Sequence, residues 1–382
     1  MTRSILMIPG PVEVDGDVLT AMARPTVGHT SPGFIETFGA CLQGLRDVFV
    51  APDGQPFVVA GSGTLAMELA VANVIEPGDR AVVADCGYFG ARMADILRRH
   101  GAQVQVVRGE LGDAPALTDI EAALAKGAKV LAITHVDTST GVLAPVKEYA
   151  ALARNASRNT LVIVDGVCAV AGQEFRQTEW DVDVCLTASQ KALAVPPGLA
   201  LVSVRPRAME AFKARKAPVA SYYCDWGLWL PIMQAYEARK PAYFGTPAVN
   251  LVVALNESVK QIKAEGIEAR WARHHKVSAA FKAGIEALGI RQVPVREDVR
   301  AVTLTTMYYP EGVDSSLLGR ISAAGAVVAG GLLPTIAGKS FRVGHMGIDG
   351  MGEILRTLSA IEQGLGIKTG AGVAAAQARW ME

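Results

Sequence analysis

The sequence predicts an α/β fold: a large domain in which helices cover both faces of a mostly parallel seven-stranded sheet, followed by a smaller α+β domain. Between residues 56 and 204, short apolar runs alternate with segments of helical periodicity. The runs are continuously apolar, as is typical of strands that are buried on both faces. After residue 204 this alternation gives way to a second pattern with shorter strands. A chain of 382 residues is long enough for both domains.

Each predicted element of the large domain follows from a local signal. The predicted strands are the apolar runs 57–60, 81–84, 104–107, 130–134, 161–164, 182–186 and 199–204. Helical periodicity fills the segments 65–75, 89–100, 117–125 and 146–154. A further helix over 33–49 follows Ser31 and Pro32, because proline suits the first helical position.

The second part of the chain predicts helices over 206–216, 247–265, 267–288, 315–324 and 352–365, and strands over 301–307, 327–328 and 341–343. The aromatic-rich stretch 221–243 could form core, a subunit interface or a pocket wall, and we predict core or interface. Residues 366–376 are rich in Gly and Ala, and we expect at least partial disorder there. The predicted organisation is an N-terminal arm (1–20), a large domain (21–265) and a small domain (266–382).

Composition excludes several classes of function. No apolar run is long enough to span a bilayer, and 37 basic residues balance 37 acidic ones without a basic cluster. We therefore expect neither a nucleic acid nor a membrane as partner. The N-terminus lacks the features of a signal or transit peptide, so the cytoplasm is the expected location. The five cysteines show no metal-ligand spacing, which predicts small buried residues in a reducing compartment and no metal site.

A lysine follows the predicted strand 182–186. Lys191 stands among small residues, just before a Pro-Pro-Gly turn. Ligands of parallel α/β sheets bind at the carboxyl ends of the strands. A partly desolvated lysine there can lose its proton and form a Schiff base with an aldehyde such as pyridoxal phosphate. The alternative interpretation is an ordinary solvated loop lysine, so the assignment depends on the neighbouring motifs.

A carboxylate closes the preceding predicted strand. Asp165 follows the run 161–164 and lies 26 residues before Lys191. An aspartate beside a pyridine nitrogen keeps that nitrogen protonated, which lets the ring withdraw electrons from a carbanion. A turn or capping aspartate is the alternative. Because the two residues end successive strands, one cofactor ring could lie across both.

The stretch Ser62-Gly63-Thr64 forms a glycine turn between a predicted strand and a helix. A turn of this kind directs backbone amides and the helix N-terminus toward an anion, which suits a phosphate. The spacing matches neither a P-loop nor a complete GxGxxG motif. A simple helix cap by Ser62 or Thr64 carries comparable weight.

Four other features have both a structural and a functional interpretation. The segment 134–141 offers hydroxyl groups at the same sheet edge, and its His135 is better explained as a buried structural histidine than as a base. An aromatic ring at 88–89 could cover a cofactor or belong to the core. Arg342 lies inside a predicted strand and needs a partner, either an internal acid or, as we favour, a substrate carboxylate. Gly10, between two prolines, predicts a close backbone approach or a surface turn.

Together these stretches resemble the class V pyridoxal-phosphate aminotransferases of fold type I, and within them most closely the fungal type of alanine–glyoxylate aminotransferase. The resemblance covers almost the whole chain and is carried by residues 8–11, 28–32, 60–64, 134–141, 164–168, 186–191, 242–247, 327–331 and 342–347. It implies pyridoxal 5'-phosphate as cofactor, held by Lys191 as an aldimine. It also implies ping-pong transfer of an amino group from L-alanine to glyoxylate, giving pyruvate and glycine.

The resemblance assigns roles residue by residue. Lys191 would also move the substrate proton, Asp165 would pair with the pyridine nitrogen, and Arg342 would bind the substrate carboxylate beside the Gly10 turn. The other implied cofactor contacts are Val167 and Phe89 on the two ring faces, Thr138 at the ring hydroxyl, and Ser62, Gly63, Thr64 and Gln190 at the phosphate. Tyr243 and Thr246 would reach the phosphate of the other subunit, which implies a homodimer with shared active sites. The chain departs from the family where Phe89 replaces a frequent tryptophan and Ala248 a frequent proline.

Other activities remain open. A serine–glyoxylate or serine–pyruvate aminotransferase, or another class V enzyme with a small amino donor, would differ only in its pocket. Such a difference is worth roughly 1–3 kcal/mol. A cysteine desulfurase would need a reactive cysteine on a mobile loop, for which only Cys224 is a candidate. A catalytically inactive relative that acts as a binding protein is the most distant alternative.

Overall fold

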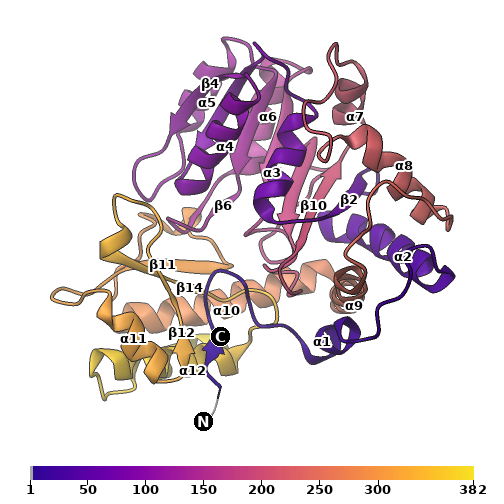
Figure 1. The fold of residues 1–382 in the computed structure, drawn as a ribbon. Coiled ribbons are helices and arrows are strands. Elements are labelled where there is room, and N and C mark those ends of the chain that lie inside the picture. The colour runs from indigo at the N-terminus through magenta and orange to yellow at the C-terminus, as the bar shows by residue number, and fades with distance from the viewer. Residues whose placement is uncertain (1–2) are drawn as a thin grey trace.

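The computed structural model describes residues 3–382, so the first two residues of the predicted arm lie outside it. Its centre is a seven-stranded sheet, which confirms the predicted architecture (Figure 1). In order across the sheet, the strands are β2 (Gln55–Ala60), β10 (Leu199–Val204), β9 (Val184–Ala188), β8 (Leu161–Asp165), β5 (Val130–Thr134), β3 (Arg80–Asp85) and β4 (Gln103–Arg108). Strand β10 runs antiparallel to both neighbours and the remaining pairs are parallel. The carboxyl ends of β2, β5, β8 and β9 therefore lie at one edge.

Helices cover both faces of this sheet (Figure 1). Helices α3 (Gly63–Ala72) and α4 (Tyr88–Arg99) pack together on one face, and α5 (Leu117–Leu124) and α6 (Val146–Ala156) on the other. Every residue of β5, β8, β9 and β10 is buried, as the continuous apolar runs predicted. Helix α2 (Pro32–Phe49) begins at Pro32, directly after Ser31, also as predicted.

The aromatic-rich stretch belongs largely to the core. It follows α7 (Pro206–Lys213) and contains α8 (Trp226–Glu237), which the sequence did not resolve as a helix. Trp226 and Trp229 are buried, and the Trp226 ring stacks 5.8 Å from the Phe57 ring. Tyr222 and Tyr243 are instead exposed at 74% and 68%. The core part of the prediction is thus confirmed, while an interface at the exposed tyrosines stays a prediction.

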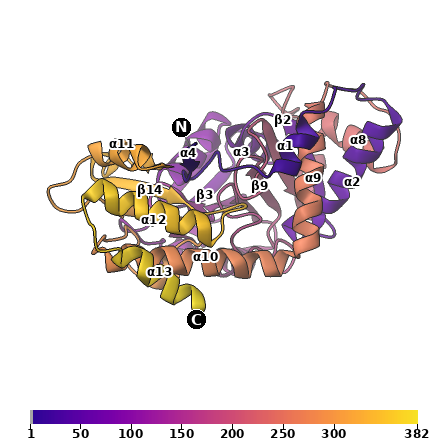
Figure 2. The same ribbon diagram turned by 90° about the horizontal axis from the view of Figure 1, so that it is seen from below.

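A long helix leads into the second part of the chain (Figure 2). Helix α9 (Val249–Glu265) packs on α1 (Gly16–Met22) and α2, and ends at Gly266, whose φ of +83° lets the chain turn into α10 (Ile267–Ala287). A three-stranded antiparallel sheet lies beyond, in the order β11 (Leu304–Tyr308), β14 (Ser340–Gly344) and β13 (Ala329–Gly330). The remaining elements are β6 (Val136–Asp137), β7 (Val142–Leu143), α11 (Ser316–Ala323), α12 (Met351–Leu365) and the 3-10 turns Glu297–Val299 and Ala337–Lys339.

The N-terminal arm connects the two hydrophobic cores. Strand β1 (Ile5–Leu6) pairs in parallel with β12 (Ala326–Val327) of the second part. Ile5 and Met7 belong to the smaller core cluster, whereas Val12 belongs to the larger one. The arm therefore passes directly across the edge where the large sheet presents its carboxyl ends. The domain limits at residues 20/21 and 265/266 stay a prediction.

The expectation of partial disorder over 366–376 is wrong. Helix α13 (Ala371–Met381) packs along α10, with Gly372 and Ala376 buried (Figure 2). A Cβ added at Gly284 of α10 would lie 2.8 Å from the Gly372 carbonyl oxygen, so small residues let the two helices approach closely. The Glu362 carboxylate also accepts a 2.9 Å hydrogen bond from the Gly372 amide. The Gly/Ala composition thus reflects close helix packing.

Among residues 3–382, the structure contains no helix that combines the length and apolarity needed to cross a bilayer.

Candidate active site

Most of the predicted site residues meet in one cavity at the carboxyl edge of the large sheet. The cavity has a volume of about 160 Å³. Its lining residues are Ser62, Gly63, Thr64, Met67, Phe89, Arg92, Val136, Thr138, Asp165, Val167, Cys168, Gln190 and Lys191. The loops after β2, β5, β8 and β9 supply most of them, because these strands end at the same edge.

Lys191 lies against the N-terminal arm. It follows β9 by three residues, and its Nζ donates a hydrogen bond to the carbonyl oxygen of Pro9. Gly10 has a φ of +105°, and a Cβ there would lie 2.6 Å from both Nζ and Cδ of Lys191. The close backbone approach predicted for Gly10 is therefore confirmed. Its neighbour is the lysine side chain, 182 residues further along the chain than Pro9.

Asp165 ends β8 as a buried carboxylate. Its Oδ1 accepts a 3.0 Å hydrogen bond from the Val167 amide. The pKa of Asp165 is raised to about 6, chiefly by burial and with a contribution from the Asp137 carboxylate, while the Val167 amide and Lys191 act in the opposite direction. No group of residues 3–382 donates to Oδ2, which leaves this oxygen for a donor inside the cavity.

The start of α3 offers uncommitted hydrogen-bond donors. Ser62 occupies the N-cap position without a side-chain capping bond, so its hydroxyl and the first amides of α3 are available to an anion. The Thr64 hydroxyl instead accepts a 3.1 Å hydrogen bond from Arg92. The Gln190 amide oxygen is buried without a partner among the described residues, so this amide is free to turn its NH₂ group into the cavity. The simple-cap interpretation of Ser62 does not hold.

Arg92 is a lining residue that the sequence analysis missed. Its guanidinium lies 4.9 Å from the centre of the Phe89 ring and 5.2 Å from that of Tyr88. The signal was present in the spacing, because a residue three positions after Phe89 lies on the same face of a helix. Arg92 adds a positive charge at the end of the cavity where Thr64 lies.

Asp137, which was also missed, fixes the start of α4. Its carboxylate accepts hydrogen bonds from the amides of Phe89 (2.9 Å) and Gly90 (3.3 Å) and from the Ser139 hydroxyl (2.6 Å). The buried Asp137 thereby replaces an N-cap from within the same helix and sets where the Phe89 ring projects. Its neighbour Thr138 lines the cavity.

Arg342 lies in the middle strand of the second sheet. Its guanidinium donates to the Gly330 carbonyl oxygen (2.8 Å) and to the Thr138 hydroxyl (2.9 Å), and burial lowers its pKa. No carboxylate of residues 3–382 lies within 4.0 Å of it. The internal acid is therefore ruled out, which leaves a ligand carboxylate as the partner we favour.

Other candidates lie away from the cavity. His135 is buried against Phe175 and Trp180, and burial lowers its pKa to about 3, which confirms the structural interpretation. Tyr243 and Thr246 lie between α8 and α9 and do not line the cavity. All five cysteines are buried and unpaired.

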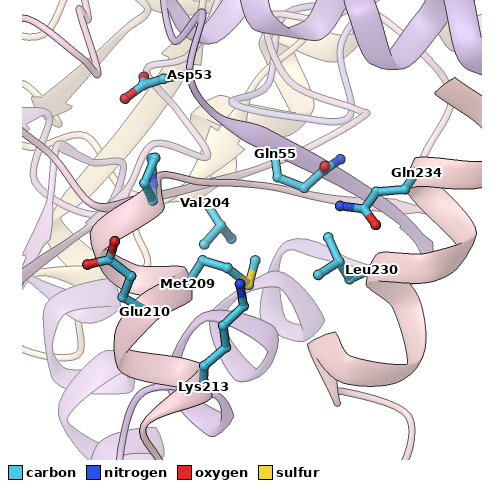
Figure 3. A pocket seen from close by; sticks show the side chains of 9 residues that line it. Asp53, Gln55, Val204, Met209, Glu210, Lys213, Leu230 and Gln234 are labelled. Atoms are coloured by element: carbon cyan, nitrogen blue, oxygen red, sulfur yellow. The ribbon is translucent and has the colours of Figure 1, made fainter. Parts of the chain in front are cut away.

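A separate hollow lies at the opposite edge of the sheet, between α7 and α8 (Figure 3). Its floor is apolar, and Lys213 of α7 and Gln234 of α8 lie at its rim. It contains none of the predicted site residues. Its position near Gln55, where β2 begins, separates it from the edge that carries Lys191.

The fold and the cavity define an α/β protein with a ligand site at the carboxyl edge of its large sheet. The model of the family "Aminotransferase class-V" matches residues 19–332, so the chain belongs to the class V aminotransferases. Alanine–glyoxylate aminotransferase 1 of Saccharomyces cerevisiae is 38% identical over 364 residues, covering 91% of this chain and 94% of the relative. L-aspartate–glyoxylate aminotransferase of Paracoccus denitrificans is 33% identical and covers 100% and 97%.

The solved structure of ureidoglycine–glyoxylate aminotransferase from Bacillus subtilis superimposes with a TM-score of 0.92 at 30% identity, covering 100% of this chain and 99% of that one. Membership in the family makes pyridoxal phosphate the cofactor of this chain. The cavity fits this group. Asp165 can face a ring nitrogen, and the donors at Ser62, Gly63 and Gln190 can face a phosphate.

Proposed function

We propose that this aminotransferase moves the amino group of L-alanine to glyoxylate, giving pyruvate and glycine in two ping-pong half-reactions. The observation that carries the proposal is the arrangement of Gly10, Lys191 and Arg342. Gly10 leaves no room for a side chain beside Lys191. Nε and Nη1 of Arg342 donate to Gly330 and Thr138, and its Nη2 has no hydrogen-bond partner among residues 3–382. A small amino acid with one carboxylate suits this space.

In this proposal the cavity residues first bind and orient the cofactor. Ser62, Gly63, Thr64 and Gln190 would hold its phosphate, Phe89 and Val167 would cover its ring, and Thr138 would contact its hydroxyl. When bound, pyridoxal phosphate supplies an electron sink for the substrate Cα. Asp165 holds a proton on the ring nitrogen, and its buried position strengthens that charge pair.

Lys191 would carry the cofactor and then move the proton. With an amino donor bound, its free Nζ would act as the base that takes the proton from the substrate Cα and as the acid that gives it back. The Pro9 carbonyl accepts a hydrogen bond from Nζ and so orients it between proton transfers. Arg342 binds the α-carboxylate and thereby fixes which face of Cα meets Lys191.

The charges that line the cavity bear on which amino donor fits. An aspartate donor needs a second cation for its distal carboxylate. The guanidinium that lines the cavity, that of Arg92, contacts Thr64 at the proposed phosphate end. Serine differs from alanine by one hydroxyl and is the first alternative.

A desulfurase is disfavoured because Cys224 is only 4% exposed and burial raises its pKa. An inactive binding protein has no need for the complete set of cavity residues.

The proposal includes a homodimer with shared sites. Tyr243 is exposed and its ring lies 5.5 Å from the His29 ring, at the surface and outside the cavity of its own chain. This supports the idea that Tyr243 and Thr246 reach a phosphate bound to the partner subunit. The cytoplasm as location stays a prediction.

The test is a donor comparison with glyoxylate as acceptor. We expect kcat/KM to be highest for L-alanine, within tenfold for L-serine, and at least tenfold lower for L-aspartate. Double-reciprocal plots at several glyoxylate concentrations should give parallel lines. A tenfold preference for aspartate would overturn the donor assignment, and intersecting lines would contradict the ping-pong order.

A further inference from the structure

Arg270 is a buried cation that forms hydrogen bonds with three loops. It lies near the start of α10, is 5% exposed, and donates to main-chain carbonyl oxygens of three separate segments. The acceptors are Ala171 (2.9 Å), Ala192 (2.7 Å) and Gly347 (3.2 Å). A 2.8 Å ion pair with Glu265 at the end of α9 holds the guanidinium from the other side.

Each of these carbonyls belongs to a loop that carries one proposed site residue. Ala171 lies in the loop that follows Asp165, Ala192 directly follows Lys191, and Gly347 lies in the loop that follows Arg342. The single planar guanidinium of Arg270 therefore connects the loops that carry Asp165, Lys191 and Arg342. Arginine suits this task because its five donors have fixed directions.

Two of the loops bound by Arg270 contain residues with an unfavourable backbone conformation. Ala171 has a φ of +68°, and Ala194, in the loop of Lys191, has a φ of +52°. Residues with a Cβ avoid this left-handed region because the Cβ approaches the backbone carbonyl oxygen, so such conformations persist only where the surroundings hold them. The Gly347 loop packs directly on the lysine loop, because a Cβ at Gly347 would lie 3.3 Å from the Ala194 Cβ.

His274, one helical turn after Arg270, completes the contact to Gly347. Its Nε2 accepts a 3.0 Å hydrogen bond from the Gly347 amide, and its Nδ1 lies 2.8 Å from the Arg270 carbonyl oxygen. A neutral ring satisfies both contacts by accepting at Nε2 and donating at Nδ1, and burial favours this form by lowering its pKa to about 3. Residue Gly347 is thus held through both its N–H and its C=O group.

We propose that Arg270 is a positioning residue that sets the spacing between the Lys191 amine, the Asp165 carboxylate and the Arg342 guanidinium. The inference rests on the roles proposed above for those three residues. Arg270 itself lies behind the cavity and does not line it. A displacement of about 1 Å between reacting groups can lower a rate about 100-fold, so fixing the three loops matters for turnover.

The chain offers a matched control in Arg273. This arginine shares two partners with Arg270, Glu265 (2.6 Å) and the Gly347 carbonyl (3.0 Å), but it reaches neither Ala171 nor Ala192. Arg270→Met and Arg273→Met therefore both remove a cation from the Glu265 pair. Only the first also frees the loops that carry Asp165 and Lys191.

The experiment compares both variants as holoenzymes with the wild type. We expect Arg270→Met to lower kcat by about 10- to 100-fold, to weaken binding of pyridoxal phosphate to the apoenzyme, and to change the visible circular dichroism of the bound cofactor. Arg273→Met should stay within about threefold in kcat and keep the wild-type dichroism. Arg270→Lys, which keeps the charge and part of the hydrogen bonding, should recover part of the lost kcat.

Equal kcat values and equal dichroism in the two Met variants would overturn the inference and leave Arg270 a purely structural residue. If Arg270→Met does not fold, Arg270→Gln takes its place, and wild-type kcat and dichroism in that variant would have the same meaning. If the Lys191→Ala protein instead keeps the visible cofactor band of the wild type, the assignment of Lys191 is refuted, whatever the Arg270 variants do.

Discussion

A buried carboxylate close to a second buried carboxylate is costly to ionise, and Asp165 is in this situation beside Asp137. Its pKa of about 6 means that the protein groups around the Asp165 carboxylate only partly compensate its negative charge. A protonated ring nitrogen would supply the missing positive charge. The strain on Asp165 and the affinity for the cofactor are thus two consequences of the same burial.

Asp165 should therefore make the stability of the cofactor-free protein pH-dependent. Its folded pKa lies above the ordinary 3.8, so between about pH 4 and 6 the folded chain binds more protons than the unfolded one, and this contribution to stability falls as the pH rises. The expected loss is on the order of 3 kcal/mol, at 1.36 kcal/mol per pKa unit. Thermal unfolding of the apoproteins should show that the stability of Asp165→Asn relative to the wild type is greater at pH 7 than at pH 4.5. An unchanged gap would count against this pKa.

At the residue scale, the sequence was most informative where function follows strand ends. Lys191, Asp165 and Ser62 each stand directly after an apolar run, so their shared edge could be inferred from chain order. Asp137 and the Pro9 carbonyl were missed because they act through contacts 48 and 182 residues apart. A pattern along the chain does not encode such distances.

At the element scale, the arm around Gly10 is where backbone conformation and chemistry meet. The arm places its turn against Lys191, and the Val12 amide donates to the Gln190 carbonyl (3.2 Å), so the arm is tied to the lysine loop. A methyl group at position 10 would displace the flexible end of Lys191 rather than a rigid neighbour.

Gly10→Ala should therefore impair catalysis more than folding. We expect the rate at which L-alanine bleaches the visible cofactor band to fall about 100-fold, because the amine moves out of line. The positive φ adds a destabilisation of roughly 1–2 kcal/mol. Stopped-flow absorbance measures the rate. Gly16→Ala is the control, since nothing lies within 4 Å of its added Cβ. A wild-type rate for Gly10→Ala would show that the contact with Lys191 has no catalytic role.

The strands themselves were predictable, whereas their order was not. Continuous apolar runs identify buried strands but carry no information on direction, so the antiparallel β10 between β2 and β9 could not be foreseen. The error at α13 has a different cause. Composition alone predicted disorder over 366–376. The small residues Gly372 and Ala376 instead let helix α13 pack closely against α10.

At the scale of the whole molecule, the proposed site is complete only when both parts of the chain are in place. The large sheet supplies Lys191 and Asp165, the second sheet supplies Arg342, and the arm crosses between them. The proposed dimer extends this dependence to a second copy through Tyr243 and Thr246.

Mixing two defective subunits tests the shared site. Lys191→Ala and the double variant Tyr243→Ala/Thr246→Ala should each have little activity alone. A mixed dimer, formed by co-expression with two tags, has one site with an intact lysine and an intact partner loop. Random pairing should restore roughly a quarter of the wild-type activity, since half of the dimers are mixed and one of their two sites is intact. No recovery in purified mixed dimers would contradict a shared site.

The central claim is that Lys191 holds the cofactor and that alanine and glyoxylate run the two half-reactions. The most direct measurement is the visible spectrum of the wild type and of Lys191→Ala with pyridoxal phosphate, before and after L-alanine and then glyoxylate. We predict a yellow wild-type band that bleaches with alanine and returns with glyoxylate, and a folded Lys191→Ala protein that lacks this band. A Lys191→Ala protein with the wild-type band, or a wild-type band that neither substrate changes, would contradict the account.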